Sequence, residues 1–149
     1  MERVTYFFYG TLMDPAVASR VTGMAVTAAR LRTATLEGYR RGRVVDQTYP
    51  AITPLVDNRV EGRLFRNAPE EAQRRIAAYE EKTYVLKWEW VRGPGGIKTR
   101  ALVFVAGPAM KLTDEDWDVE DWCRQHRRPF LMTLDRWTKE FERTTDVQA

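Results

Sequence analysis

Glu80 is the acidic residue whose position in the sequence best suits proton-transfer chemistry. Upstream of it, Ala72, Ile76 and Tyr79 recur at the spacing of one helix face, and Glu80 follows Ile76 in the same row, whereas Glu81 points to the other side. Desolvation at the edge of an inward face would raise the pKa of a carboxylate and make it a better acid or base near neutral pH. A solvated helix-end glutamate, or one paired with an arginine, is an equally open interpretation, because glutamate is rarely buried unpaired.

The segment 9–12, Tyr-Gly-Thr-Leu, is the second feature that could do chemistry. It lies between a short apolar run and Asp14-Pro15, a favoured N-cap followed by a favoured first helical residue. Backbone N–H groups beside a helix N-terminus can bind an anion, and Gly10 permits a positive φ and the close approach of a ligand. A plain strand-to-helix turn needs the glycine just as much, and position alone favours that interpretation.

Cys123 and His126 offer an alternative chemistry, a thiol nucleophile with an imidazole base three residues away on an expected helix. No oxyanion-binding element can be placed beside them, so a small buried cysteine and a surface histidine is the commoner interpretation. One Cys and one His cannot supply a zinc site of three or four N or S ligands, and we expect no metal and no cofactor. A serine triad would require Ser19, the only serine, to meet His126.

The composition predicts an ordinary globular protein. The chain has 24 Lys and Arg, 21 Asp and Glu and a net charge of +3. Its length of 149 residues predicts a single domain that spans residues 1–149. The arginines are scattered rather than clustered, so we expect no nucleic-acid partner. No apolar run approaches the ~18 residues of a membrane span, and the acidic N-terminus does not resemble a signal peptide. We therefore expect a cytoplasmic protein with no membrane partner, while the oligomeric state stays open.

The pattern along the chain predicts the elements that must position these residues. Strands are expected at 4–9, 25–38, 49–54, 60–65, 84–92 and 97–106, and helices at 15–21 and 69–81. A further helical region is expected to begin at Thr113, with one or two helices over 122–143. Gly62 inside a strand suggests a bulge or a close backbone approach. Most connections are too short for crossover helices, which indicates antiparallel neighbours and an α+β domain on a mixed, partly closed sheet.

Five aromatic residues mark the C-terminal segment of about 111–143. They could form a ligand-stacking set, but the composition favours an apolar contact that fixes C-terminal helices to the sheet. These residues are Trp117, Trp122, Phe130, Trp137 and Phe141.

Several segments, in order, resemble the γ-glutamylcyclotransferase-like family, which includes γ-glutamylamine cyclotransferases and plant avirulence-induced-gene-like proteins. Residues 8–13, Phe-Tyr-Gly-Thr-Leu-Met, are similar to its "YGTL" signature. Residues 49–51 resemble its "YPA", 60–65 its "V-x-G-x-L-Y/F" strand, and 76–84 its "L-D-x-Y-E-G-x-x-Y" segment. The resemblance spans about 5–106 and implies a partly closed, β-barrel-like sheet with flanking helices.

The resemblance also implies an activity. Glu80 matches the family's catalytic glutamate, and the backbone of Tyr9, Gly10, Thr11 and Leu12 would hold the glutamyl group of a small γ-glutamyl substrate. The substrate's own α-amine would attack its γ-carbonyl and release 5-oxoproline and an amine, so that no cofactor is needed. Tyr84 is expected to line the cavity.

The sequence departs from the family pattern at two positions, Ala77 in place of Asp and Glu81 in place of Gly. These changes leave open a binding domain of the same fold that turns over nothing. The sequence does not specify the leaving amine.

Overall fold

The computed structural model describes residues 2–80 and 83–148, which form five strands, three helices and three short 3-10 turns. The strands are β1 (Val4–Phe8), β2 (Leu31–Arg43), β3 (Pro50–Ala68), β4 (Tyr84–Arg92) and β5 (Lys98–Ala106), and the helices are α1 (Pro15–Thr22), α2 (Glu70–Glu80) and α3 (Val119–Gln148). The 3-10 turns are η1 (Thr11–Met13), η2 (Ala28–Arg30) and η3 (Pro94–Gly96).

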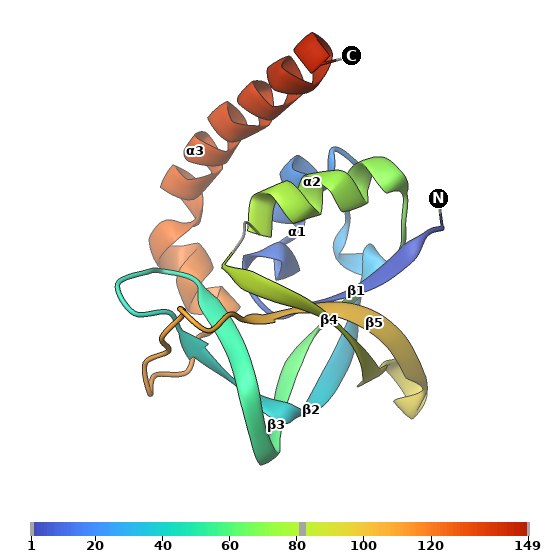
Figure 1. Cartoon of the computed structure of the whole chain (residues 1–149), viewed down its shortest axis with the longest axis vertical. Coiled ribbons are helices and arrows are strands. Elements are labelled where there is room, and N and C mark those ends of the chain that lie inside the picture. The colour runs from blue at the N-terminus through green and yellow to red at the C-terminus, as the bar shows by residue number, and fades with distance from the viewer. Residues whose placement is uncertain (1, 81–82, 149) are drawn as a thin grey trace.

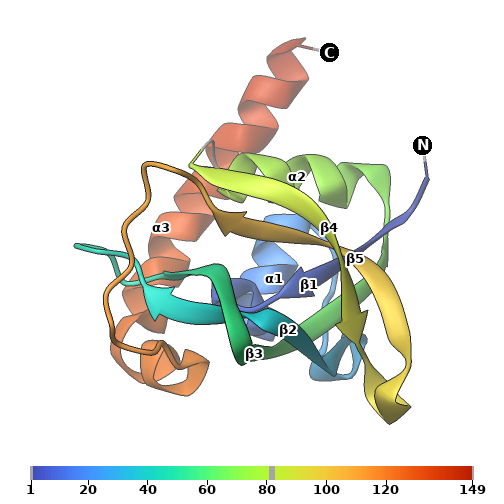
Figure 2. The same ribbon diagram turned by 60° about the horizontal axis from the view of Figure 1, so that its bottom comes forward.

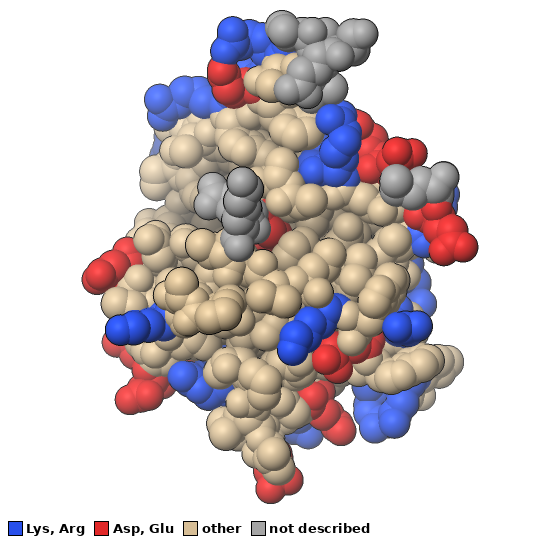
Figure 3. All heavy atoms as spheres, viewed as in Figure 1, with Lys and Arg blue, Asp and Glu red and all other residues tan. Residues whose placement is uncertain are grey.

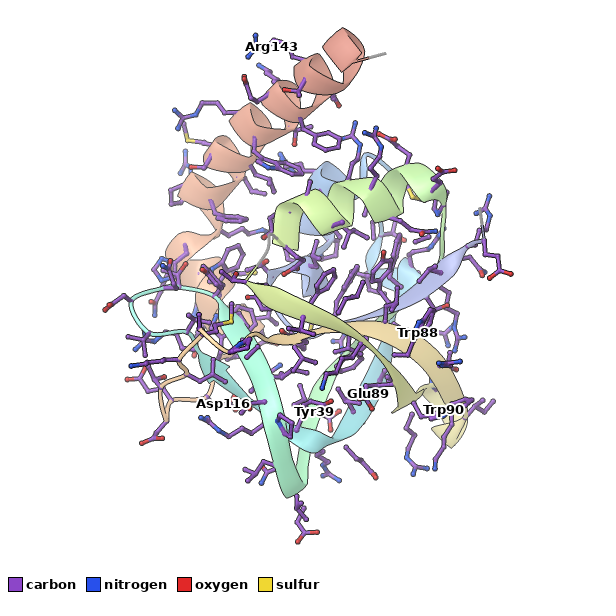
Figure 4. The ribbon with its side chains drawn as sticks, in the orientation of Figure 1. Tyr39, Trp88, Glu89, Trp90, Asp116 and Arg143 are labelled. Carbon is purple, nitrogen blue, oxygen red and sulfur yellow. The ribbon has the colours of Figure 1, made fainter. Side chains whose placement is uncertain are left out.

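The five strands close into a barrel in the order β1-β3-β2-β4-β5 (Figures 1 and 2), which confirms the expected α+β class and the mixed, barrel-like sheet. All pairs are antiparallel except β1 with β5. The β2–β4 seam has a single registered pair, Thr35 with Arg92. The Tyr39 hydroxyl of β2 donates to Glu89 of β4 at 2.9 Å, so a side-chain bond reinforces this seam (Figure 4).

The longest pairing joins β2 and β3, from Leu31 opposite Phe65 to Arg43 opposite Pro50. The expected strands at 49–54 and 60–65 are therefore two parts of one strand, because β2 pairs with residues 50–54 and with residues 59–65, and the register shift lies between these parts. The expected strand at 25–38 begins only at Leu31 and continues to Arg43. Gly38, with φ of +86°, accommodates a register shift within the strand rather than ending it.

Two apolar cores flank the wall of the barrel. Side chains that alternate along the strands fill the interior, among them Phe7, Leu36 and Leu64. The opposite face of β1, including Tyr6 and Phe8, packs beneath the helices in a second core. The helices therefore cover one side of the barrel, which Figure 1 shows above β1.

Gly62 is required by a close approach between β3 and β1. A Cβ at this position would overlap the carbonyl oxygen of Phe8 and lie 2.6 Å from Cζ of Phe7. No register shift occurs at Gly62. Of the two expectations, the close approach is correct and the bulge is wrong.

Helix α1 begins and ends as its sequence indicates. The Asp14 side chain accepts a hydrogen bond from the N–H of Val17, Pro15 occupies the first helical position, and Gly23 closes the helix in the left-handed conformation. The capping residues therefore fix the direction in which the chain leaves the loop 9–13.

The C-terminal segment forms one helix, α3, which contains Pro129. The expected helix start at Thr113 is wrong, because the Thr113 N–H donates to Arg43 and Leu112 bridges to Val44. Figures 1 and 2 agree that α3 passes α1 and α2 and that its C-terminal part projects away from the barrel.

We expected the C-terminal helices to be fixed to the sheet, but the ion pairs of helix α3 join it to the other two helices. Arg75 of α2 forms an ion pair with Glu142 at 3.0 Å, and its guanidinium lies 5.2 Å from the centre of the Phe141 ring. Arg20 of α1 forms an ion pair with Asp135 at 2.9 Å. These contacts place α3 beside the C-terminal end of α2.

The face of the protein drawn in Figure 3 carries charges of both signs, and its cationic and anionic side chains are interspersed. Trp88 and Trp90 of β4 are 48% and 64% exposed and lie on the barrel away from α3 (Figure 4). Within the described residues, no helix has the length and hydropathy of a membrane span.

The close approach at Gly62 generates a stability prediction. Gly62→Ala should destabilise the fold by about 1–3 kcal/mol, because the new methyl group must displace the backbone of β1 or the Phe7 ring. Thermal unfolding of the variant should show a melting temperature several degrees below that of the wild type. Glu61→Ala, on the exposed side of the same strand, is the matched control. Equal melting temperatures for the Gly62 variant and the wild type would contradict the assigned contact.

Candidate active site

A cavity of about 310 Å³ opens at the end of the barrel where β1 runs into the loop 9–13. Its walls come from this loop, the start of β3, the end of α2 with the start of β4, and α3. The predicted site residues Tyr9, Gly10, Thr11, Leu12 and Glu80 all line it. A cavity of this size suits a small molecule.

Gly10 does not use the positive φ that glycine permits, since its φ is −120°. A Cβ on Gly10 would lie 3.2 Å from Cγ of Pro50, a tight contact that would require the Pro50 ring to shift by a few tenths of an ångström. The turn that follows uses the amides of Met13 and Asp14, which donate to Gly10 and Thr11. Those two bonds do not use the amides of Gly10, Thr11 and Leu12, the residues that line the cavity.

The N-terminus of α1 is already neutralised by the chain's own carboxylate. Asp14 is 6% exposed, caps the helix through Val17 and forms an ion pair with Arg127 at 3.2 Å. The positive end of the helix dipole therefore faces Asp14. Any anion held at this end of the cavity must depend on the amides of the loop rather than on the helix end.

Glu80, the last residue of α2, places its carboxylate in the cavity. Ala72 and Ile76 of the same row are fully buried beneath the helix. Glu80 itself is half-buried, and the surface that it retains faces the cavity. Burial raises the pKa of Glu80 from 4.5 to about 8. The expectation for Glu81 lies outside the described residues.

Two tyrosines stand beside the Glu80 carboxylate as neutral phenols. The hydroxyl of Tyr79 shares a 2.6 Å hydrogen bond with Oγ1 of Thr11, which joins α2 to the loop. The Tyr9 hydroxyl donates to the carbonyl of Phe104. Burial and the nearby Glu80 charge raise the pKa of Tyr79, and burial followed by the charges of Tyr84 and Glu80 raises that of Tyr9. Both phenols therefore keep their protons at neutral pH.

Residues from neighbouring strands hold the cavity walls in place. Arg41 of β2 donates to the carbonyls of Tyr9 and Glu61, each at 3.1 Å, and so fixes the end of β1. Tyr84, which lines the cavity, donates to the carbonyl of Pro50 at 2.8 Å. The indole N–H of Trp117 donates to the carbonyl of Thr48 at 2.8 Å. The loop before β3 is thus tied to the segment before α3.

Cys123 and His126, the alternative nucleophile and base, lie outside the described lining of the cavity. The Cys123 thiol lies 3.8 Å from Asp14, and burial, with the Asp14 charge, raises the pKa of the thiol. A raised pKa disfavours the thiolate that would attack a substrate.

Helix α3 supplies a wall of the cavity, a role that the sequence interpretation ranked second. Trp122, Phe130 and Trp137 line the cavity, whereas an apolar contact with the sheet was favoured over a ligand-stacking set. The sequence contains the spacing that places these residues together, since 130, 133, 134 and 137 follow the i, i+3, i+4, i+7 pattern of one helix face. Within residues 2–80 and 83–148, no cluster of three or more His, Cys, Asp or Glu side chains could hold a metal ion.

Comparison with known proteins agrees with this geometry. The sequence model of the family described as "Gamma-glutamyl cyclotransferase, AIG2-like" matches residues 6–124. AIG2-like protein A of Arabidopsis thaliana is 27% identical over 133 residues, which cover 86% of this chain and 77% of that protein. The chain therefore belongs to the AIG2-like γ-glutamyl cyclotransferase family.

Two solved structures share the fold. A solution structure from Arabidopsis thaliana superposes with a TM-score of 0.66 at 21% identity and covers 100% of this chain and 89% of its own. A structure described as a γ-glutamyl cyclotransferase gives a TM-score of 0.56 at 12% identity, with 89% and 86% of the two chains covered.

Ala77, one of the two residues that depart from the family pattern, does not line the cavity. Ala77 is exposed on α2, and it is absent from the described lining residues. Glu81, the other departure, lies outside the described residues. The alanine therefore leaves the chemistry of the described cavity wall unchanged.

The raised pKa of Glu80 predicts how stability varies with pH. The folded state favours the protonated carboxyl, so its contribution is complete below pH 4.5 and is lost as the pH rises through about 8. Glu80→Gln cannot ionise and avoids this loss. At pH 8.5 its melting temperature should exceed that of the wild type by at least ~2–4 °C, whereas the two should converge near pH 4.5.

The matched control for this prediction is Glu71→Gln on the same helix. Hydrogen bonds from Arg74, with a further one from Arg75, lower the pKa of Glu71, so removing this charge should not stabilise the protein at pH 8.5. Differential scanning calorimetry from pH 4.5 to 8.5 measures both variants. A pH-independent difference between Glu80→Gln and the wild type would contradict the raised pKa.

Proposed function

We propose that this protein is a γ-glutamyl cyclotransferase that converts a γ-glutamyl amide into 5-oxoproline and a free amine. The observation that carries the proposal is the carboxylate of Glu80, desolvated in a small cavity opposite the loop 9–12. Family membership supports the same class of reaction. Because the nucleophile belongs to the substrate, the enzyme needs no nucleophile of its own.

Glu80 acts as the acid and base of the reaction. Glu80 accepts a proton from the α-ammonium group of the substrate, and the neutral amine then attacks the γ-carbonyl carbon. The bond between the γ-carbon and the amide nitrogen breaks as Glu80 gives its proton to the departing nitrogen. The restored carboxylate takes the second proton from the new ring nitrogen and passes it to the amine, which leaves as an ammonium ion beside 5-oxoproline.

The pair formed by Thr11 and Tyr79 polarises the γ-carbonyl. Their two hydroxyl groups carry two hydrogens, and the 2.6 Å bond between them uses one. The second hydrogen is therefore available to a carbonyl oxygen in the cavity. As negative charge develops on that oxygen, a neutral hydroxyl in a dry site stabilises it. The amides of the loop 9–12 bind the α-carboxylate of the substrate.

The pKa of Glu80 suits this task. An α-amine has an ordinary pKa of about 8, and burial raises the pKa of Glu80 to about 8 as well. Proton transfer between groups of matched pKa costs little free energy in either direction. A carboxylate with an ordinary pKa would be a much weaker base toward the ammonium group of the substrate.

The first test of the proposal is the loss of turnover in Glu80→Gln. The amide keeps the size of the side chain but cannot accept the amine proton, so kcat should fall by at least ~10²–10⁴. Release of 5-oxoproline from a panel of γ-glutamyl amides, followed by chromatography, measures the rate. The wild type must turn over at least one member of the panel.

Cys123→Ala is the matched control, because its thiol lies outside the cavity lining and contacts Asp14. It should retain near-wild-type turnover. An inactive Cys123→Ala with an active Glu80→Gln would replace the proposal by thiol chemistry. Binding of γ-glutamyl compounds by a wild type that releases no 5-oxoproline would identify a binding domain instead.

The matched pKa values also predict a narrow pH profile. The reaction needs one proton shared between Glu80 and the α-amine of the substrate. Well below pH 8 both groups are protonated, and well above pH 8 neither is. The dependence of kcat/KM on pH should therefore be bell-shaped with its maximum near pH 8. A broad plateau from about pH 5 to 8 is the result expected for a glutamate of ordinary pKa, and it would contradict the assignment.

A further inference from the structure

Helix α3 closes one side of the cavity with a continuous aromatic surface. The Tyr79 ring meets Phe130 edge-on at 6.4 Å and Trp137 at 6.0 Å, measured between ring centres. Phe130 in turn packs against Trp122 at 5.1 Å. Leu134, on the same face of the helix, is 3% exposed. We call the cavity-lining face formed by Trp122, Phe130, Leu134 and Trp137 the α3 wall.

The loop and the α3 wall contact different parts of Tyr79. The hydroxyl of Tyr79 bonds to Thr11 of the loop, while its ring contacts the α3 wall. Glu80 follows Tyr79 directly in the chain. A substrate whose γ-glutamyl group occupies the loop and Glu80 therefore presents the rest of the molecule, the amine that will leave, to the α3 wall.

The α3 wall carries no charge and no acceptor for an ammonium group. Its polar groups are indole N–H donors, of which that of Trp122 is buried without a hydrogen-bond partner in the part of the chain that the structure describes. A neutral donor does not balance the charge of a carboxylate. Among the described residues that line the cavity, Glu80 alone carries a formal charge, and the reaction uses it. Charged side chains near the α3 wall are paired elsewhere, Arg127 with Asp14 and Asp135 with Arg20. Burying an ammonium or a carboxylate without a partner is costly, whereas burying an apolar group on an aromatic surface is favourable.

We propose that the leaving group is an uncharged, apolar amine, aromatic or bulky aliphatic, and that the α3 wall selects it. This inference rests on the proposed function and adds the class of substrate. It places amino acids, which bring a carboxylate, and diamines, which bring a second ammonium, among the poor substrates. Trp137 is the residue of the α3 wall best suited to a test, because it is only half-buried.

The experiment compares kcat/KM for three γ-glutamyl amides, those of benzylamine, glycine and putrescine. The wild type should prefer the benzylamide over each of the others by ~10–100-fold. Trp137→Ala should reduce that preference to less than threefold, because the ring loses its apolar contact. Met132→Ala, on the exposed side of the same helix and outside the described lining, should keep the wild-type preference.

A second variant reverses the selectivity instead of removing it. Thr133 lines the cavity from an exposed helix position, so a change here does not disturb the core. Thr133→Asp adds a carboxylate beside the α3 wall and should raise kcat/KM for the putrescine amide relative to the benzylamide by ~10-fold or more. Thr133→Asn, of the same size without the charge, should not.

The outcomes separate this inference from the proposed function. If the wild type releases 5-oxoproline but prefers the glycine or putrescine amide, the inference is wrong and the cyclotransferase proposal stands. A preference for the putrescine amide would identify the aromatic surface as a cation-binding cage. If no amide yields 5-oxoproline, the proposed function itself fails. An unchanged preference in Trp137→Ala would also overturn the role of the α3 wall.

Discussion

The carboxylate of Glu80 is held inside the protein, where burial raises its pKa to about 8. Water-filled surroundings would return the group to an ordinary glutamate, so the fold must keep bulk solvent from one polar group at the end of a helix. Ala72 and Ile76 anchor the helix below it, and the loop 9–12 and α3 cover it on other sides. This constraint links elements that are distant in the sequence.

The barrel supplies the rigidity that this arrangement needs. Its strands pair around a filled interior, and Gly62 lets β3 approach β1 where β1 delivers the loop to the cavity. Arg41 then fixes the first residue of the loop through the Tyr9 carbonyl. At the other end, the Asp14 cap of α1 fixes the residue at which the chain leaves the loop, so both ends are held by regular structure.

Helix α3 lines the same cavity as Glu80, so the proposed reaction brings catalysis and the choice of amine to one site. Its ion pairs with α1 and α2 place an aromatic face over the cavity without using the charges of the cavity itself. The same Tyr79 contacts the loop through its hydroxyl and the α3 wall through its ring. The reacting group and the leaving group thereby share one boundary residue, and a change in α3 can alter the choice of amine while Glu80 and the loop remain in place.

Local signals in the sequence determined much of this protein. Asp14, Pro15 and Gly23 specified α1, and the 72-76-80 row placed Glu80 on the inward side of α2, because caps and helical periodicity act within a few residues. Glu80 stayed ambiguous between a solvated and a desolvated group, since nothing in its own segment says what covers it.

The tertiary structure decided what covers Glu80 and what the covering is made of. The two expected strands merge into β3 because β2 pairs with both parts of it, 50–54 and 59–65. The expected helix start at Thr113 is wrong because β2 takes that backbone as a partner. The α3 aromatics became a cavity wall through contacts with Tyr79, some fifty residues away in the chain. The desolvation of a carboxylate depends on all the atoms that surround it, and most of these belong to residues far away in the sequence, so a local sequence pattern does not determine it.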